Sequence, residues 1–175
     1  MKTKNRLVNF SSVVLASGFL MGIASHSSAA TEGGTIKLAA RRAIDEFKLG
    51  GYKQFTDEVK KITKADIPIE TNWVELSKQL EGRDDVPATL KDYFDNMFGK
   101  TILGAFKSIC SDKTGQEALK GAVKKIVIKC DDNAKASENG FSLEKGVLTL
   151  NLYYANTDQV ENRTKGMIKL LENNL

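Results

Sequence analysis

The chain has 175 residues, with 26 Lys plus Arg, 22 Asp plus Glu, two cysteines and a single histidine, His26. A chain that begins after residue 30 therefore contains no histidine, which excludes Ser-His-Asp and Cys-His catalysis and His-based zinc sites. The net charge of +4 is no reason to expect nucleic-acid binding, because that function requires basic residues clustered on one face.

The first thirty residues have the pattern of a secretory signal peptide. A basic start with Lys2, Lys4 and Arg6 is followed by a short apolar stretch, and Ser28-Ala29-Ala30 supplies small residues before a cut. The serines, glycines and asparagine within that stretch make it a poor membrane span. We predict that residues 1–30 are a cleaved signal peptide. Residues 31–175 then form a single domain in the periplasm or outside the cell, with no integral membrane segment.

Two amphipathic helices are predicted after the signal. The first has apolar residues at helical spacing from Ile36 to Phe47, and Gly50-Gly51 is expected to end it. The second repeats this spacing from Tyr52 to Ile62. The segment 66–70 is then predicted as a short strand, and Pro68 places that strand at a sheet edge because proline has no amide donor.

Helical patterns continue through the middle of the chain. A short helix is predicted from Trp73 to Leu80, and a longer apolar stripe runs from Leu90 to Ile109. Gly99 interrupts that stripe, so it indicates either one bent helix or two helices. Thr114-Gly115-Gln116-Glu117 has the form of a capping box and predicts the start of another short helix.

The apolar period changes from helical to two after residue 123. Ile126, Ile128 and Cys130 share one face of a predicted strand, and Lys125 and Lys129 share the other. Apolar alternation then continues on both sides of a Lys-Gly turn, which predicts a hairpin over 140–154. An amphipathic helix closes the chain.

These elements predict the α+β class. We expect a small antiparallel sheet of about three to four strands, including hairpin 140–154, packed on one face by several helices and by the C-terminal amphipathic helix. No internal repeat and no linker divides residues 31–175.

The two cysteines, Cys110 and Cys130, favour a disulfide, because an even cysteine count in an exported protein commonly means a bridge. The bridge would join the end of the central helix to the end of the first main strand. Two buried free thiols are the alternative. The spacing is far from C-x-x-C, so no redox role is expected.

No cofactor or metal site is expected. The segment Asp131-Asp132-Asn133 offers too few oxygen ligands for calcium. Phe98-Gly99-Lys100-Thr101 resembles the end of a phosphate-binding loop, but Phe94 stands where that motif needs its first glycine.

Aromatic and basic residues are the candidate binding positions. Tyr153 is expected to share the exposed face of the sheet with Lys125 and Lys129, and Trp73 is a further candidate. The carboxylate pairs Asp92 with Asp95 and Glu70 with Glu75 leave a glycan hydrolase open as an alternative, since such an enzyme needs two carboxyls about 5–9 Å apart.

The sequence therefore favours a non-catalytic binding module whose partner is another protein. An inhibitor or immunity-type protein directed against an envelope-acting toxin or enzyme fits this description. A carboxylate-based hydrolase of cell-envelope glycans and a secreted effector are the alternatives.

Overall fold

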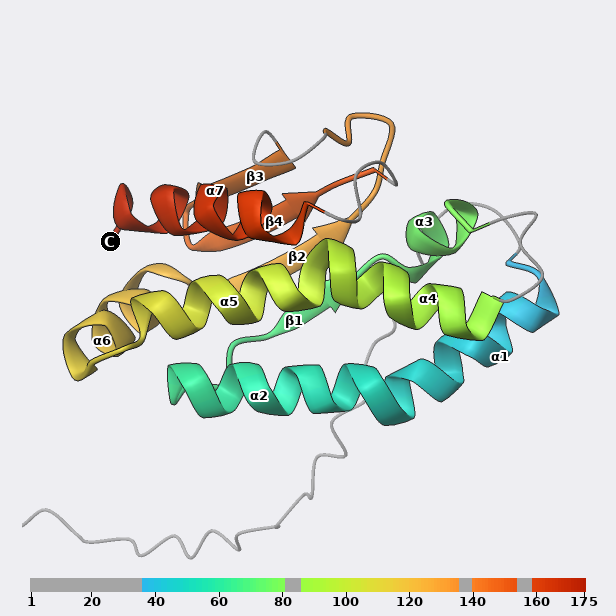
Figure 1. Cartoon of the computed structure of the whole chain (residues 1–175), viewed down its shortest axis with the longest axis horizontal. Coiled ribbons are helices and arrows are strands. Elements are labelled where there is room, and N and C mark those ends of the chain that lie inside the picture. Colours follow the sequence, from blue (N-terminus) through green and yellow to red (C-terminus); the bar gives the residue numbers. More distant parts are fainter. Residues whose placement is uncertain (1–35, 81–85, 136–139, 154–158) are drawn as a thin grey trace, which may run out of the picture. The chain divides into compact units, whose positions relative to one another are not determined.

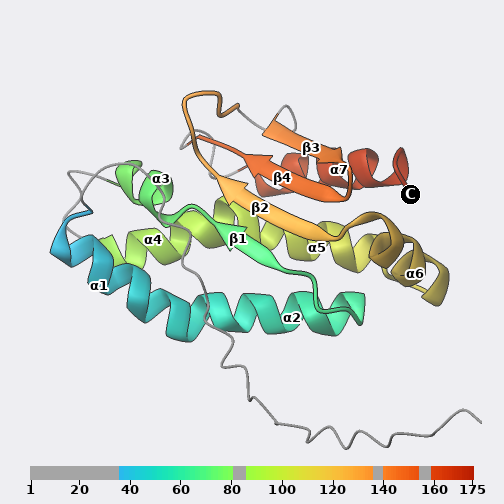
Figure 2. The ribbon, with the colours of Figure 1, turned by 180° about the vertical axis from the view of Figure 1, so that it is seen from behind.

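The computed structural model describes residues 36–80, 86–135, 140–153 and 159–175, with the side chains of the second range described from Leu90 onward. The predicted signal peptide lies outside the described residues. Within them, a layer of helices packs against one face of a four-stranded sheet (Figures 1 and 2). The predicted α+β class, with helices on one face of a small sheet, is confirmed.

The helices and strands follow one another along the chain with two five-residue π-helical turns among them. The order is α1 (Leu38–Phe47), η1 (Lys48–Tyr52), α2 (Lys53–Thr63), β1 (Ile69–Thr71), α3 (Trp73–Lys78), α4 (Val86–Phe94), η2 (Asp95–Gly99), α5 (Lys100–Ile109), α6 (Lys113–Ala122), β2 (Lys125–Lys129), β3 (Phe141–Glu144), β4 (Val147–Asn151) and α7 (Val160–Glu172).

The sheet is mixed, and the expectation of an antiparallel sheet is wrong for two of its three strand pairs. The strand order is β1-β2-β4-β3. β1 pairs with β2, and β2 with β4, in parallel, whereas only β3 and β4 are antiparallel. Parallel pairing requires a long crossover, which the helices α3 to α6 supply between β1 and β2. Apolar alternation predicts which side chains share a face of the sheet, but it does not indicate whether neighbouring strands pair in parallel or antiparallel.

The alternating faces agree with the predicted pattern. Ile126 and Ile128 on β2 and Leu148 and Leu150 on β4 are completely buried against the helices. The side chains between them on each strand are partly exposed. Burial of this apolar face is the main term that holds the sheet to the helix layer.

The predicted hairpin is confirmed, and its turn has the backbone that a tight connection requires. Lys145 and Gly146 both adopt positive φ, at 50° and 83°. Positive φ at both central residues is the type I′ arrangement that matches the twist of the flanking strands.

Gly50-Gly51 does not end the first helix, contrary to the prediction. α1, η1 and α2 follow one another without a non-helical residue between Leu38 and Thr63. A Cβ on Gly51 would lie 2.5 Å from Cε2 of Phe47, whereas Gly50 has open space around it. Gly51 therefore lets the Phe47 ring pack against the helix backbone. Gly99 likewise lies within a continuous helical segment, α4–η2–α5.

The predicted capping box at Thr114 is also wrong. α6 begins one residue earlier than that box, at Lys113, and the carboxylate of Asp112 accepts a hydrogen bond from the Gly115 amide at 2.8 Å. Gly115 is needed because an added Cβ would lie 1.8 Å from the Ile109 carbonyl oxygen. Asp and Thr are both good N-cap residues, so residue type alone could not show that Asp112, and not Thr114, caps α6.

A buried arginine joins α7 to the π-helical turn η2. Arg163 is completely buried, and its Nη2 donates to the Asn96 carbonyl oxygen at 2.7 Å. A π-helical turn pairs its amides with more distant carbonyls than an α-helix does, so this element is suited to accepting an outside donor. None of the helices that the structure describes is long and apolar enough to span a bilayer.

Candidate functional site

The face of the sheet that points away from the helices is the strongest candidate for a binding surface. No described helix covers it, as Figure 2 shows from that side. We call it the outer sheet face. Its side chains, placed by the strand register, are Glu70 on β1, Lys125, Val127 and Lys129 on β2, Val147, Thr149 and Asn151 on β4, and Ser142 and Glu144 on β3.

The outer sheet face carries two partly exposed valines among polar side chains. Val127 lies beside Thr149, and Val147 lies beside Lys125, in the register of β2 and β4. Both valines are partly exposed. Protein interfaces commonly combine apolar and polar side chains. Alternation in the sequence predicted this face, but the two valines were not among the predicted site residues.

Lys125 and Lys129 lie on this face, as predicted, and each is held by a carboxylate. The Lys125 Nζ is 2.6 Å from Oε1 of Glu70 on the neighbouring strand. The Lys129 Nζ is 2.6 Å from Oδ2 of Asp131. The two ion pairs place both ammonium groups beside carboxylates at the surface of the sheet.

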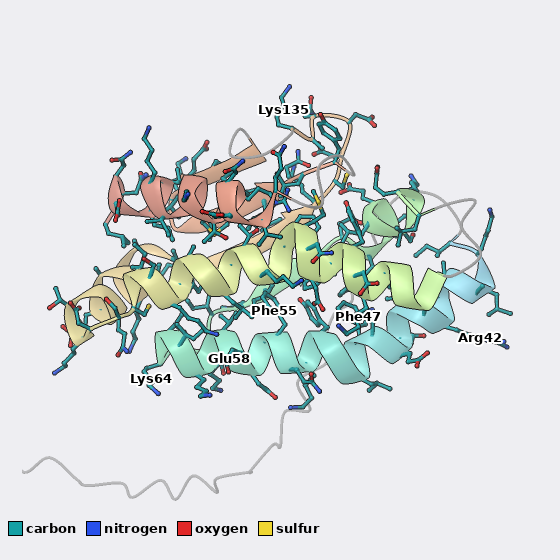
Figure 3. The ribbon with its side chains drawn as sticks, in the orientation of Figure 1. Arg42, Phe47, Phe55, Glu58, Lys64 and Lys135 are labelled. Carbon is teal, nitrogen blue, oxygen red and sulfur yellow. The ribbon has the colours of Figure 1, made fainter. Side chains whose placement is uncertain are left out.

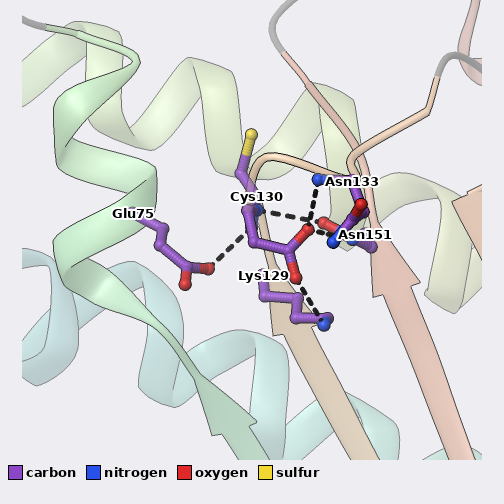
Figure 4. A network of polar contacts seen from close by, with 6 residues as sticks. Glu75, Lys129, Cys130, Asn133 and Asn151 are labelled. Atoms are coloured by element: carbon purple, nitrogen blue, oxygen red, sulfur yellow. Dashed lines mark hydrogen bonds and ion pairs between the residues drawn. The ribbon is translucent and has the colours of Figure 1, made fainter. Parts of the chain in front are cut away.

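Asp131 is the centre of a polar network at the ends of β2 and β4 (Figure 4). Its carboxylate accepts hydrogen bonds from Lys129 Nζ at 2.6 Å, Asn151 Nδ2 at 2.6 Å and the Asn133 amide at 2.8 Å. The Asn151 Oδ1 in turn accepts from the Asp131 amide at 3.1 Å. The bonds from Lys129 and Asn151 lower the pKa of Asp131 from 3.8 to about 2. Asp131 is thus a structural anion that joins the ends of β2 and β4.

Tyr153 follows the buried Leu152 directly and is 40% exposed. The alternation along β4 places it on the outer side of the sheet, as predicted. Its participation in binding stays a prediction.

Trp73 does not join the outer sheet face. It begins α3, and its ring lies edge-on to Tyr52 and Phe47, with ring centroids 4.9 and 6.0 Å away. The Lys48 Nζ lies 5.4 Å from the Trp73 ring centroid. These contacts place Trp73 in the aromatic cluster of the helix layer, where it is partly buried against the core.

Both cysteines are buried free thiols in this structure. The Cys130 thiol is hydrogen-bonded to the Tyr93 side chain, and its backbone amide donates to Oε2 of Glu75 at 3.1 Å. Burial is the main cause that raises the pKa of Cys130, and burial also raises the pKa of Cys110. Raised thiol pKa values mean little thiolate near neutral pH and low reactivity.

The predicted Cys110–Cys130 disulfide is not formed in this structure. Tyr93, which contacts Cys130, and Cys110 lie toward opposite ends of the continuous segment α4–η2–α5. At the helical rise per residue they are about 25 Å apart along the axis. A disulfide needs Cα atoms within about 7 Å. Formation of the bridge would therefore require the backbone to move.

The four candidate carboxylates do not converge. Glu70 pairs with Lys125 on the outer sheet face, whereas Asp95 pairs with Lys91 at 2.7 Å in the helix layer. The Glu75 carboxylate, on α3, accepts a hydrogen bond from the Cys130 amide. Asp92 is exposed on α4. Among the described residues, no group of three or more His, Cys, Asp or Glu side chains could hold a metal ion.

Comparisons with known protein families, with curated proteins and with solved structures found no match to this chain.

Proposed function

We propose that the protein is exported to the periplasm or the extracellular space and acts there as a non-catalytic binding module. Its partner in this proposal is another protein, an envelope-acting toxin or enzyme that it inhibits or neutralises. The observation that carries the proposal is the outer sheet face, which no described helix covers and on which Val127 and Val147 are partly exposed among polar side chains.

The polar contacts on this face support a binding role, because they position several of its side chains. Lys125 and Lys129 are each held by an ion pair at 2.6 Å, and Asn151 is bonded to Asp131 in both directions. A surface whose side chains are already ordered loses less conformational freedom when it binds. Sheet backbone fixed on one side by a buried core is a stable platform for such a surface.

The hydrolase alternative receives no comparable support. A retaining or inverting glycosidase requires two carboxyl groups at a set separation across the scissile bond. Of the two candidate pairs, Glu70 is paired with Lys125 and Glu75 accepts the Cys130 amide. In the other pair, Asp95 is paired with Lys91.

Quantitative capture from an envelope extract tests the proposal. The wild type is compared with Val127→Arg on the outer sheet face and with Gln54→Arg on the exposed surface of α2. Both substitutions add the same charge. A partner should be recovered with the wild type and Gln54→Arg at similar yield, and Val127→Arg should reduce that yield at least tenfold.

Two outcomes would contradict the proposal. Equal recovery of the partner by Val127→Arg and Gln54→Arg would remove the outer sheet face as the binding surface. Turnover of a cell-wall glycan that is abolished by Asp95→Asn would favour the hydrolase. Melting temperatures of all variants serve as the control for folding.

A further inference from the structure

Lysines gather at one end of the domain, away from the centre of the outer sheet face. α2 and α5 end there, α6 lies there, and β2 and β4 begin there (Figures 1 and 2). We call this surface the lysine end. Its basic residues are Lys60, Lys61 and Lys64 from α2 and its cap, Lys107 from α5, Lys113 and Lys120 from α6, Lys124, and Lys145 from the hairpin turn.

Contacts between these elements bring the lysines together. Glu58 on α2 pairs with both Lys61, at 3.4 Å, and Lys107, at 3.7 Å. The Lys124 amide donates to the Gly146 carbonyl oxygen at 2.7 Å, which holds the hairpin turn against the end of α6. The lysine end is therefore one surface built from several segments.

The positive charge of this surface is only partly neutralised. Lys60, Lys61, Lys107 and Lys113 have carboxylate partners. Three exposed lysines, Lys64, Lys120 and Lys145, form no ion pair with any residue that the structure describes, and Lys124 donates to the Lys120 carbonyl oxygen. The carboxylates on the same elements are Asp57, Glu58, Asp66, Asp112, Glu117 and Glu144. α7 also ends on this side of the domain, with Glu172 and the C-terminus (Figure 1).

Two of these lysines occupy backbone positions that do not favour lysine. Among the described residues, Lys64 and Lys145 are the non-glycine residues with positive φ, at 52° and 50°. Glycine or asparagine is preferred at such positions. Both side chains are exposed. Complementation of a helix dipole explains lysines in the last turns of α2, α5 and α6, but it does not explain Lys145 in a hairpin turn.

We propose that the lysine end binds the anionic headgroups of a lipid bilayer and so holds the exported protein at a membrane surface. The elements that form it contribute lysine and no arginine. Lysine acts as a hydrated point charge, which suits diffuse surface charge better than recognition of one bidentate phosphate. Each lysine near an anionic bilayer strengthens binding by about fivefold.

Sedimentation with lipid vesicles tests this proposal on the full chain purified from an exporting host. Vesicles of phosphatidylcholine with about one-third phosphatidylglycerol are compared with pure phosphatidylcholine. The wild type should bind the anionic vesicles only, and the binding should disappear at 1 M salt, where the Debye length is about 3 Å.

Lys64→Gly/Lys145→Gly should weaken vesicle binding at least tenfold without lowering the melting temperature. Glycine suits the positive φ of both positions, so this variant removes the two charges without straining the backbone. Lys64→Gln/Lys145→Gln should weaken the binding equally. The matched control is Lys78→Gln/Lys135→Gln, which removes two exposed lysines elsewhere. In Figure 3, Lys64 is at the lower left and Lys135 is at the top.

Binding that is equal for both vesicle types, or equally weakened by the control substitutions, would overturn the proposal. So would tight binding of soluble polyphosphate by a protein that ignores anionic vesicles, because the ligand would then be a free polyanion. A drop in melting temperature for the glycine variant would assign Lys64 and Lys145 a structural role.

Discussion

At the level of single residues, Asp131 illustrates how one carboxylate stabilises the ends of two neighbouring strands. It accepts hydrogen bonds from Lys129, the last residue of β2, and from Asn151, the last residue of β4. Asp131→Asn removes the charge from these bonds and should lower the free energy of unfolding by about 1–2 kcal/mol at pH 7. Urea denaturation measures this change. Asp132→Asn, at the exposed neighbour, is the control and should change stability by less than about 0.5 kcal/mol.

The same residue predicts a pH dependence. Folding lowers the pKa of Asp131 from 3.8 to about 2. Its contribution is therefore fully present above about pH 5 and is lost as the pH falls toward 2. The stability difference between wild type and Asp131→Asn should shrink over this range. A difference that stays constant from about pH 6 to about pH 2.5 would show that the ionised carboxylate is not the stabilising group.

The cysteines provide a second test at this level. The geometry here predicts two free thiols when the unreduced protein is denatured and titrated, because both cysteines are buried thiols. In the folded protein they should react slowly, since burial raises both pKa values. Finding no free thiol would show instead that the disulfide predicted from cysteine count and compartment forms, and that α5 and β2 are arranged differently in the oxidised protein.

At the level of helices and strands, two adjacent glycines in η1 should respond oppositely to the same substitution. Gly50→Ala should stabilise the protein by about 0.5–1 kcal/mol, because alanine is a better helix former and Gly50 has open space. Gly51→Ala should destabilise it by about 1–3 kcal/mol, because its Cβ would lie 2.5 Å from the Phe47 ring. Thermal unfolding of the two variants measures both effects. Similar effects of the two substitutions would contradict the continuous helix.

The elements also show where sequence patterns are sufficient and where they are not. Periods of two and of 3.6 identified β2, the hairpin and the amphipathic helices, because burial on one face imposes those periods. Gly50-Gly51 was wrongly predicted to end a helix because a glycine required by a neighbouring ring looks the same as a glycine required by a turn. The parallel pairing of β1, β2 and β4 depends on crossovers far apart in the sequence, which no local pattern records.

The candidate site was predictable only in part for the same reason. Lys125, Lys129 and Tyr153 were placed on the exposed face by alternation alone. The packing of Trp73 could not be predicted, because its partners Phe47 and Tyr52 come from elements that are distant in the sequence. The network of Asp131 with Asn151 joins residues from the ends of two strands and could not be predicted from either segment.

At the level of the whole molecule, export is a prediction that mass spectrometry checks directly. Protein recovered from the periplasm or the medium should begin at Thr31, because the cut is expected after Ala30. The mass of the exported chain is sufficient for this test, since it locates the first residue. An intact Met1 in material confined to the cytoplasm would contradict export and the proposed role with it.

Binding of a protein partner by the outer sheet face can be tested in living cells by photo-crosslinking. A photoreactive amino acid is placed at Thr149 on that face and, in a separate strain, at the exposed Gln54 on α2. We predict a discrete crosslinked protein from Thr149 that is absent from Gln54. No crosslink from Thr149, or the same product from both positions, would contradict the proposed binding surface.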